Sequence, residues 1–165
     1  MATVRHGRKA RTRRVASRRI MLHYEHPPRT APEADTLRGF LDSHRAMILW
    51  KLEGLTQEQA TYRTVPSATT LLGVVKHLAW VERWWFGDFI GGQSFEYPWS
   101  DEDPDADWRI EADETVESIS QFYADCVAAA NEVMEAAESL DVTGTLSSGE
   151  RSLRWVLIHM IEETA

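Results

Sequence analysis

Apolar residues recur every three or four positions along four long segments of this chain, and that spacing restricts it to helices. The clearest stripe lies in segment 113–139, and segments 33–53, 68–90 and 152–165 carry further apolar faces. A helix with one apolar face must bury it against another element. The spacing therefore predicts an all-α fold, a four-helix bundle in which each helix contributes one face.

The composition of these faces identifies the candidate core. In 113–139 the stripe is Val116, Ile119, Phe122, Tyr123, Cys126, Ala130, Val133, Met134 and Ala137. The face of 33–53 is Leu37, Phe40, Leu41, Met47, Ile48 and Leu52, and that of 68–90 is Leu71, Val74, Val75, Leu78, Val81, Trp85 and Phe89. Lys76 and Arg83 are expected on the solvated side of 68–90. Cys126 is expected to be a small core residue rather than a nucleophile.

Local signals set the expected ends of these helices. Asp113 is the expected N-cap of its helix, Gly54 follows the first helix, and Thr56 with Gln59 matches a capping box. The connection 93–112 is too long for a simple hairpin, so the helices on either side of it are expected to run parallel.

The last helix has no stop signal before Ala165. At 1.5 Å per residue it is roughly 21 Å long, whereas segment 113–139 spans roughly 40 Å. We expect from this difference that the bundle is truncated at its C-terminus. We also expect part of the long stripe, around Tyr123 and Cys126, to be exposed.

Charge divides the chain into two parts. Residues 1–22 hold 8 of the 18 Lys and Arg residues and no Asp or Glu, which leaves 10 basic and 26 acidic side chains in the rest. We predict a disordered basic arm and Pro-rich linker over 1–32, dispensable for folding, and the bundle over 33–165. The acidic body argues against binding to nucleic acid or a membrane surface. The single cysteine suits a reducing compartment, so a cytoplasmic location is expected.

Several ionisable side chains fall on or beside the apolar faces. His44 and Lys51 lie on the first helix, His77 on the second, and His159 and Glu163 on the last. Two imidazoles and a carboxylate that converge from separate helices would suit a divalent transition metal. Each has a simpler interpretation: an inward histidine can be a hydrogen-bonded core residue, and Glu163 can pair with a basic side chain. The acidic run 101–107 lacks the Gly and Glu of a calcium loop, so we expect a solvated loop anchored by Trp108.

Five stretches of this chain resemble one known family. They are Trp50–Leu55, Leu71–Leu78, Glu82–Phe86, Glu102–Asp107 and Leu153–Glu163. Together they look like the actinobacterial DUF664 group of the DinB/YfiT-like superfamily, which includes mycothiol-dependent maleylpyruvate isomerases. The resemblance covers about residues 35–165.

The resemblance implies an up-down-down-up bundle with zinc or nickel held by three side chains. His77 and Glu163 match two of these ligands, and the third would fall two positions beyond Ala165. His159 lies one turn before that pair and is a candidate substitute ligand.

Two functions follow as hypotheses. The first is a metal-dependent transferase or isomerase of unknown small-molecule substrate that uses a low-molecular-weight thiol such as mycothiol. In it, His44 or Lys51 would act as an acid, base or anion contact. The second is a non-catalytic or inactive truncated bundle with a binding or structural role, for which a homodimer is one option. Whether the chain is an enzyme is left open between the two.

Overall fold

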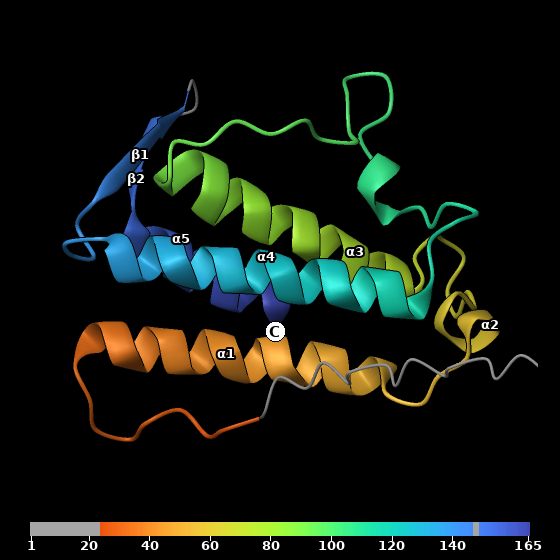
Figure 1. Cartoon of the computed structure of the whole chain (residues 1–165), viewed down its shortest axis with the longest axis horizontal. Coiled ribbons are helices and arrows are strands. Elements are labelled where there is room, and N and C mark those ends of the chain that lie inside the picture. Colours follow the sequence, from red (N-terminus) through yellow and green to blue (C-terminus); the bar gives the residue numbers. More distant parts are fainter. Residues whose placement is uncertain (1–23, 147–148) are drawn as a thin grey trace, which may run out of the picture.

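The computed structural model describes residues 24–146 and 149–165, and these are mostly helical (Figure 1). The basic arm predicted over 1–22 lies outside the described residues. In chain order the elements are α1 (Glu33–Leu52), α2 (Gln57–Ala60), α3 (Leu71–Glu82), the π-helix η1 (Arg83–Ile90), the 3-10 helix η2 (Ala106–Trp108), α4 (Val116–Ala136), β1 (Thr143–Leu146), β2 (Gly149–Ser152) and α5 (Leu153–Thr164). The two strands pair antiparallel, with Thr143 opposite Ser152, so a purely α fold was too strict an expectation.

Side-chain caps mark the starts of α2, α3, α4 and α5. Thr70 accepts from the amide of Gly73, and Ser152 accepts from that of Trp155. The predicted N-cap at Asp113 is wrong: Thr115 and Ser118 form a capping box there, and the helix begins at Val116. A threonine in an extended conformation can reach the third amide of the helix, which satisfies one of its unpaired donors. The capping box predicted at Thr56 and Gln59 is confirmed.

Contacts at both ends show how the long helices run. Lys76 on α3 pairs with Glu114 just before α4, and a Cβ on Gly91 after η1 would lie 3.3 Å from Val133 on α4. The helices α3 and α4 therefore run in the same direction, and the long connection carries the chain back between them. Arg154 at the start of α5 pairs with Glu33 at the start of α1, so those two helices are also parallel (Figure 1). None of the described helices is long and apolar enough to cross a bilayer.

The core has two clusters, and both include residues of α4. One contains Leu49, Leu72, Val75, Tyr123 and Cys126, and the other contains Leu41, Phe86, Met134, Val156 and Met160. The predicted exposure around Tyr123 and Cys126 is wrong, because they are only 0% and 3% exposed. Residues of α3 and α1, rather than α5, cover that part of α4. The core position predicted for Cys126 is confirmed, and burial raises the pKa of its thiol to about 11.

Charged side chains enter this core at two places that periodicity did not indicate. Arg45 and Glu82 are fully buried, and both guanidinium–carboxylate bonds between them are short, at 2.7 and 2.6 Å. The solvated position predicted for Lys76 is wrong. Its ammonium is buried, donates to the carbonyl oxygen of Arg109 at 2.6 Å and pairs with Glu114 at 2.8 Å. Phe40, predicted as core, is 45% exposed. An ion pair with a good partner can occupy a core position that spacing assigns to an apolar residue.

Residues 24–31 contact α1, so we expect their removal to lower stability. Ser43 donates to the carbonyl oxygen of Glu25 at 2.6 Å, and a Cβ on Gly39 would lie 2.6 Å from Pro28. We expect a chain that begins at Tyr24 to keep the melting temperature of the full chain. A chain that begins at Ala31 should melt a few degrees lower, since it loses about 1–2 kcal/mol of hydrogen bonding and packing. Thermal unfolding followed by circular dichroism distinguishes the two, and equal melting temperatures would show that residues 24–30 contribute nothing.

Candidate functional site

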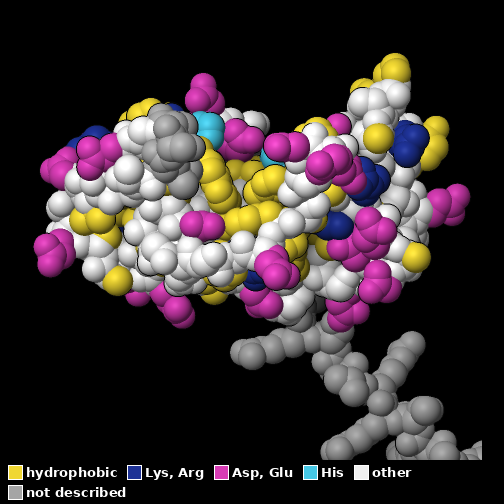
Figure 2. Space-filling view, turned by 90° about the horizontal axis from the view of Figure 1, so that it is seen from above, with side chains coloured by type: hydrophobic (Ala, Val, Ile, Leu, Met, Phe, Trp, Pro, Cys, Tyr) yellow, Lys and Arg dark blue, Asp and Glu magenta, His cyan; other side chains and the backbone are white. Residues whose placement is uncertain are grey.

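A pocket of about 350 Å³ lies where α3, η1, η2 and α5 meet, and we call it the aromatic pocket. It is lined by His77, Val81, Trp84, Trp85, Trp99, Pro104, Asp107, Trp108, His159 and Glu163. Seen from above, hydrophobic side chains gather in a hollow in the middle of the molecule, with histidine side chains along one edge of it and carboxylates nearby (Figure 2). An apolar pocket with a few converging polar groups is the usual form of a small-molecule site.

His77 projects from α3 and is held from two sides. Its Nδ1 lies 2.6 Å from Oδ2 of Asp107, and its ring stacks on Trp108 with 3.9 Å between centroids. The turn that carries Asp107 and Trp108 approaches α3 this closely because position 73 is a glycine. A Cβ there would lie 2.4 Å from the carbonyl oxygen of Trp108. In the neutral ring, a carboxylate at Nδ1 favours the tautomer with the proton on that nitrogen, which leaves the lone pair on Nε2.

Glu163 and His159 reach the same pocket from α5. The Oε1 of Glu163 lies 3.6 Å from Nε2 of His77, and its Oε2 lies 3.8 Å from Nε2 of His159. The ring of His159 stacks on Trp155 with 5.0 Å between centroids and meets the edge of Trp85. The structure thus brings together three of the residues singled out from sequence. Glu163 lies between the two imidazoles, one turn after His159 on the same helix.

His44 and Lys51 are not among the residues that line this pocket. Both lie on α1, where His44 is half-buried and Lys51 is exposed with its ammonium 6.0 Å from the ring centre of Trp50. A catalytic role for either residue stays a prediction.

Asp107 is the site residue that sequence reasoning missed. It belongs to the acidic run expected to be a solvated loop, yet its side chain is buried, so that expectation is wrong for this residue. The neighbouring Trp108 does pack against the body, at His77, as its anchoring role required. An acidic residue next to a tryptophan that anchors a loop can be buried together with it. The position of Asp107 beside Trp108 was therefore the sequence signal for its burial.

The donor set fits a divalent metal in part. Two donors about 2.1 Å from one ion stand about 3.4 Å apart at a tetrahedral angle, close to the distance between His77 and Glu163. The contact of Asp107 with Nδ1 is the outer support that metal-bound histidines usually have. As they stand, though, no three His, Cys, Asp or Glu side chains in residues 24–146 and 149–165 form a group that could hold an ion.

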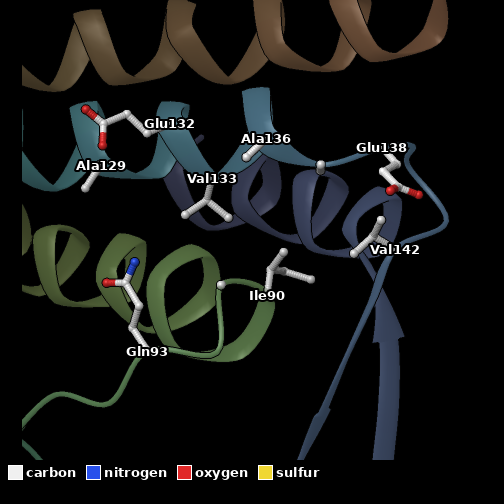
Figure 3. A pocket seen from close by; sticks show the side chains of 10 residues that line it. Ile90, Gln93, Ala129, Glu132, Val133, Ala136, Glu138 and Val142 are labelled. Carbon is white, nitrogen blue, oxygen red and sulfur yellow. The ribbon is translucent and has the colours of Figure 1, made fainter.

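A second, larger pocket of about 570 Å³ lies between η1, α4 and the segment that leads into β1 (Figure 3). Its lining is mainly aliphatic, with Gln93, Glu132 and Glu138 as the polar members. It has no histidine or cysteine, so size alone does not make it the better candidate for chemistry.

Comparison with known protein families gives a match over most of the chain. The model of a family described as mycothiol-S-transferase matches residues 36–165, which is most of the chain and includes every residue that lines the first pocket. No curated protein matches.

Proposed function

Since the chain belongs to the mycothiol-S-transferase family, we propose that it is a metal-dependent enzyme that transfers a low-molecular-weight thiol to a small electrophile in the aromatic pocket. The observation that carries this proposal is the arrangement of His77. Its Nδ1 contacts buried Asp107 at 2.6 Å, and its Nε2 lies 3.6 Å from Glu163 inside the pocket. A purely structural histidine does not need its second nitrogen aimed at a carboxylate in a cavity.

We further infer that the four long helices form an up-down-down-up bundle of the DinB type. The contacts of Lys76 with Glu114 and of Arg154 with Glu33 support this order, because they make α3 parallel to α4 and α5 parallel to α1. The hydrogen bond from Arg38 to the carbonyl oxygen of Met134 supports an antiparallel α1 and α4.

In this proposal His77 and Glu163 are ligands of zinc or nickel, with His159 as the third. His159 lines the same pocket and lies 3.8 Å from Glu163, whereas His44 is not part of the lining. When bound, such an ion lowers the pKa of a coordinating thiol, so the nucleophilic thiolate is present at neutral pH. Asp107 holds the proton on Nδ1 of His77 and fixes the orientation of the ring. The tryptophans around the pocket exclude water from the reacting sulfur.

The proposed transfer is a substitution at carbon. The thiol loses its proton to solvent, its sulfur forms a bond to an electrophilic carbon, and the group on that carbon leaves with its bonding electrons. With chlorodinitrobenzene the products are a thioether, chloride and a proton. The chain would contribute position and a dry environment rather than a covalent intermediate.

A non-catalytic binding bundle is the second candidate, and one observation favours it. The described residues contain no ready group of three metal donors, so His77 and Asp107 could form a structural hydrogen bond and no more. Metal content distinguishes the two candidates, because the binding bundle should bind no ion at stoichiometric level.

Asp107→Asn provides the direct test. We expect the wild-type protein, incubated with zinc or nickel and then desalted, to retain metal and to consume mycothiol with chlorodinitrobenzene. Asp107→Asn keeps the size of the side chain but removes the charge behind His77, so metal affinity should fall roughly 10–100-fold. Asp103→Asn is the matched control, since Asp103 lies in the same loop and pairs with Arg109 at 2.8 Å instead. A wild-type protein that retains no metal, or equal metal affinity in the two variants, contradicts the proposal.

A further inference from the structure

The walls of the aromatic pocket are rigid tryptophans. Trp85 packs edge-on against Phe89 with 5.2 Å between centroids, and Trp108 stacks on His77 at 3.9 Å. Trp99 stacks on Tyr97 at 4.5 Å, and the hydroxyl of Tyr97 donates to Asp88 at 3.1 Å. Rings that are already held by neighbours lose little freedom when a ligand binds, so they favour a flat partner.

The charges of the same pocket are acidic. Asp107 and Glu163 line it, and no Lys or Arg does so in the described part of the chain. The basic groups next in sequence to its lining are engaged elsewhere. Lys76 pairs with Glu114, Arg109 binds Asp103, and the guanidinium of Arg83 lies over the ring of Phe122. Apart from the two histidines, a negatively charged ligand would therefore meet two carboxylates and no basic side chain in the lining, in a partly desolvated space where repulsion is stronger than in water.

From these two features we propose that the pocket selects planar aromatic compounds that carry no negative charge, and that such a compound is the electrophile of the transfer. The assignment as electrophile rests on the proposed function, whereas the binding preference rests on the pocket alone. The volume of about 350 Å³ suits a one- or two-ring compound, since it lies near the lower end of the roughly 300–1,000 Å³ of ligand pockets. Aliphatic dicarboxylates are disfavoured because they have no aromatic ring and because they are negatively charged.

The amide and the carboxylate of naphthalene test this preference, because they share size and shape and differ in charge at pH 7.5. Binding to the full chain is measured by ligand-observed NMR and calorimetry with a chelator present, so that no metal attracts the anion. We expect the amide to bind roughly tenfold tighter or more, as one repulsive unit charge in this setting implies. Equal affinities, tighter binding of the carboxylate, or no binding of the amide would overturn the proposal.

Two variants and one control locate the effect within the pocket. Trp99→Ala removes a half-buried wall residue from the connection and should weaken amide binding roughly tenfold. Trp50→Ala is its control, since Trp50 is 68% exposed on α1 and is not part of the lining. Glu163→Gln should reduce the ratio of amide affinity to carboxylate affinity, because it removes one of the two carboxylates of the lining. An unchanged ratio in Glu163→Gln would show that the charge argument is wrong.

The outcomes also separate this inference from the proposed function. If the wild-type protein binds no metal but discriminates between the two naphthalenes, the metal-dependent transfer fails and the pocket preference stands. If it binds metal and transfers the thiol but shows no such discrimination, the preference fails alone.

Discussion

Glu82→Ala is expected to lower the free energy of unfolding by about 3–5 kcal/mol, the largest effect on stability that we expect from a single change in this chain. Glu82 and Arg45 are both 0% exposed and share two hydrogen bonds of 2.7 and 2.6 Å. Burial lowers the pKa of Arg45, but the attraction and hydrogen bonds of Glu82 outweigh burial and raise it. The guanidinium therefore stays charged, and removal of its carboxylate leaves a buried charge whose remaining hydrogen-bond partners, among the residues that the structure describes, are Asp42 and Asn131.

Urea unfolding followed by circular dichroism measures this loss, and Asp42→Ala is the control. Asp42 also binds Arg45, at 2.8 Å, but its side chain is 56% exposed, so its loss should cost less than about 1 kcal/mol. The double variant Arg45→Met with Glu82→Leu should recover much of the stability, because it removes both charges and keeps the volume. A loss below about 1 kcal/mol in Glu82→Ala would mean that water or another partner reaches Arg45.

His77→Gln is expected to remove metal binding and thiol transfer to below detection, the largest functional effect of a single change. The glutamine can still hydrogen-bond with buried Asp107, so the fold should survive. It cannot present an imidazole nitrogen to Glu163, and a site left with at most two donors keeps an ion mostly hydrated. Metal retained after desalting and the rate of thioether formation are the two measurements.

Variants of two further histidines serve as comparisons for His77→Gln. His26→Gln should change nothing, since His26 is exposed and its hydrogen bond within the described part of the chain is the local one with Tyr24. His159→Gln distinguishes two roles: equal loss of metal in His77→Gln and His159→Gln makes His159 a ligand, whereas retained metal makes it a packing residue against Trp155. Metal binding that persists in His77→Gln would contradict the metal site as proposed.

The connection 93–112 shows what local sequence can and cannot predict. Its length alone predicted that the helices on either side run parallel, and the contacts at both ends of α3 and α4 agree. Its acidic composition suggested solvation, which fails for Asp107 because Gly73 leaves room for that turn against α3. Composition describes the average of a loop, whereas burial of one residue depends on what the opposite helix leaves open.

The sequence by itself determined the long helices, the capping box at Thr56, the core stripe of α4 with Cys126 in it, and the candidates His77, His159 and Glu163. These features depend on spacing of three or four residues, which is local. Only the tertiary structure decided which side chains meet: Asp107 with His77 across 30 positions, Glu82 with Arg45 across 37, and Lys76 with Glu114 across 38. A buried charge is tolerated only where another element supplies a partner of opposite charge or a hydrogen-bond acceptor. Helical periodicity does not indicate that partner.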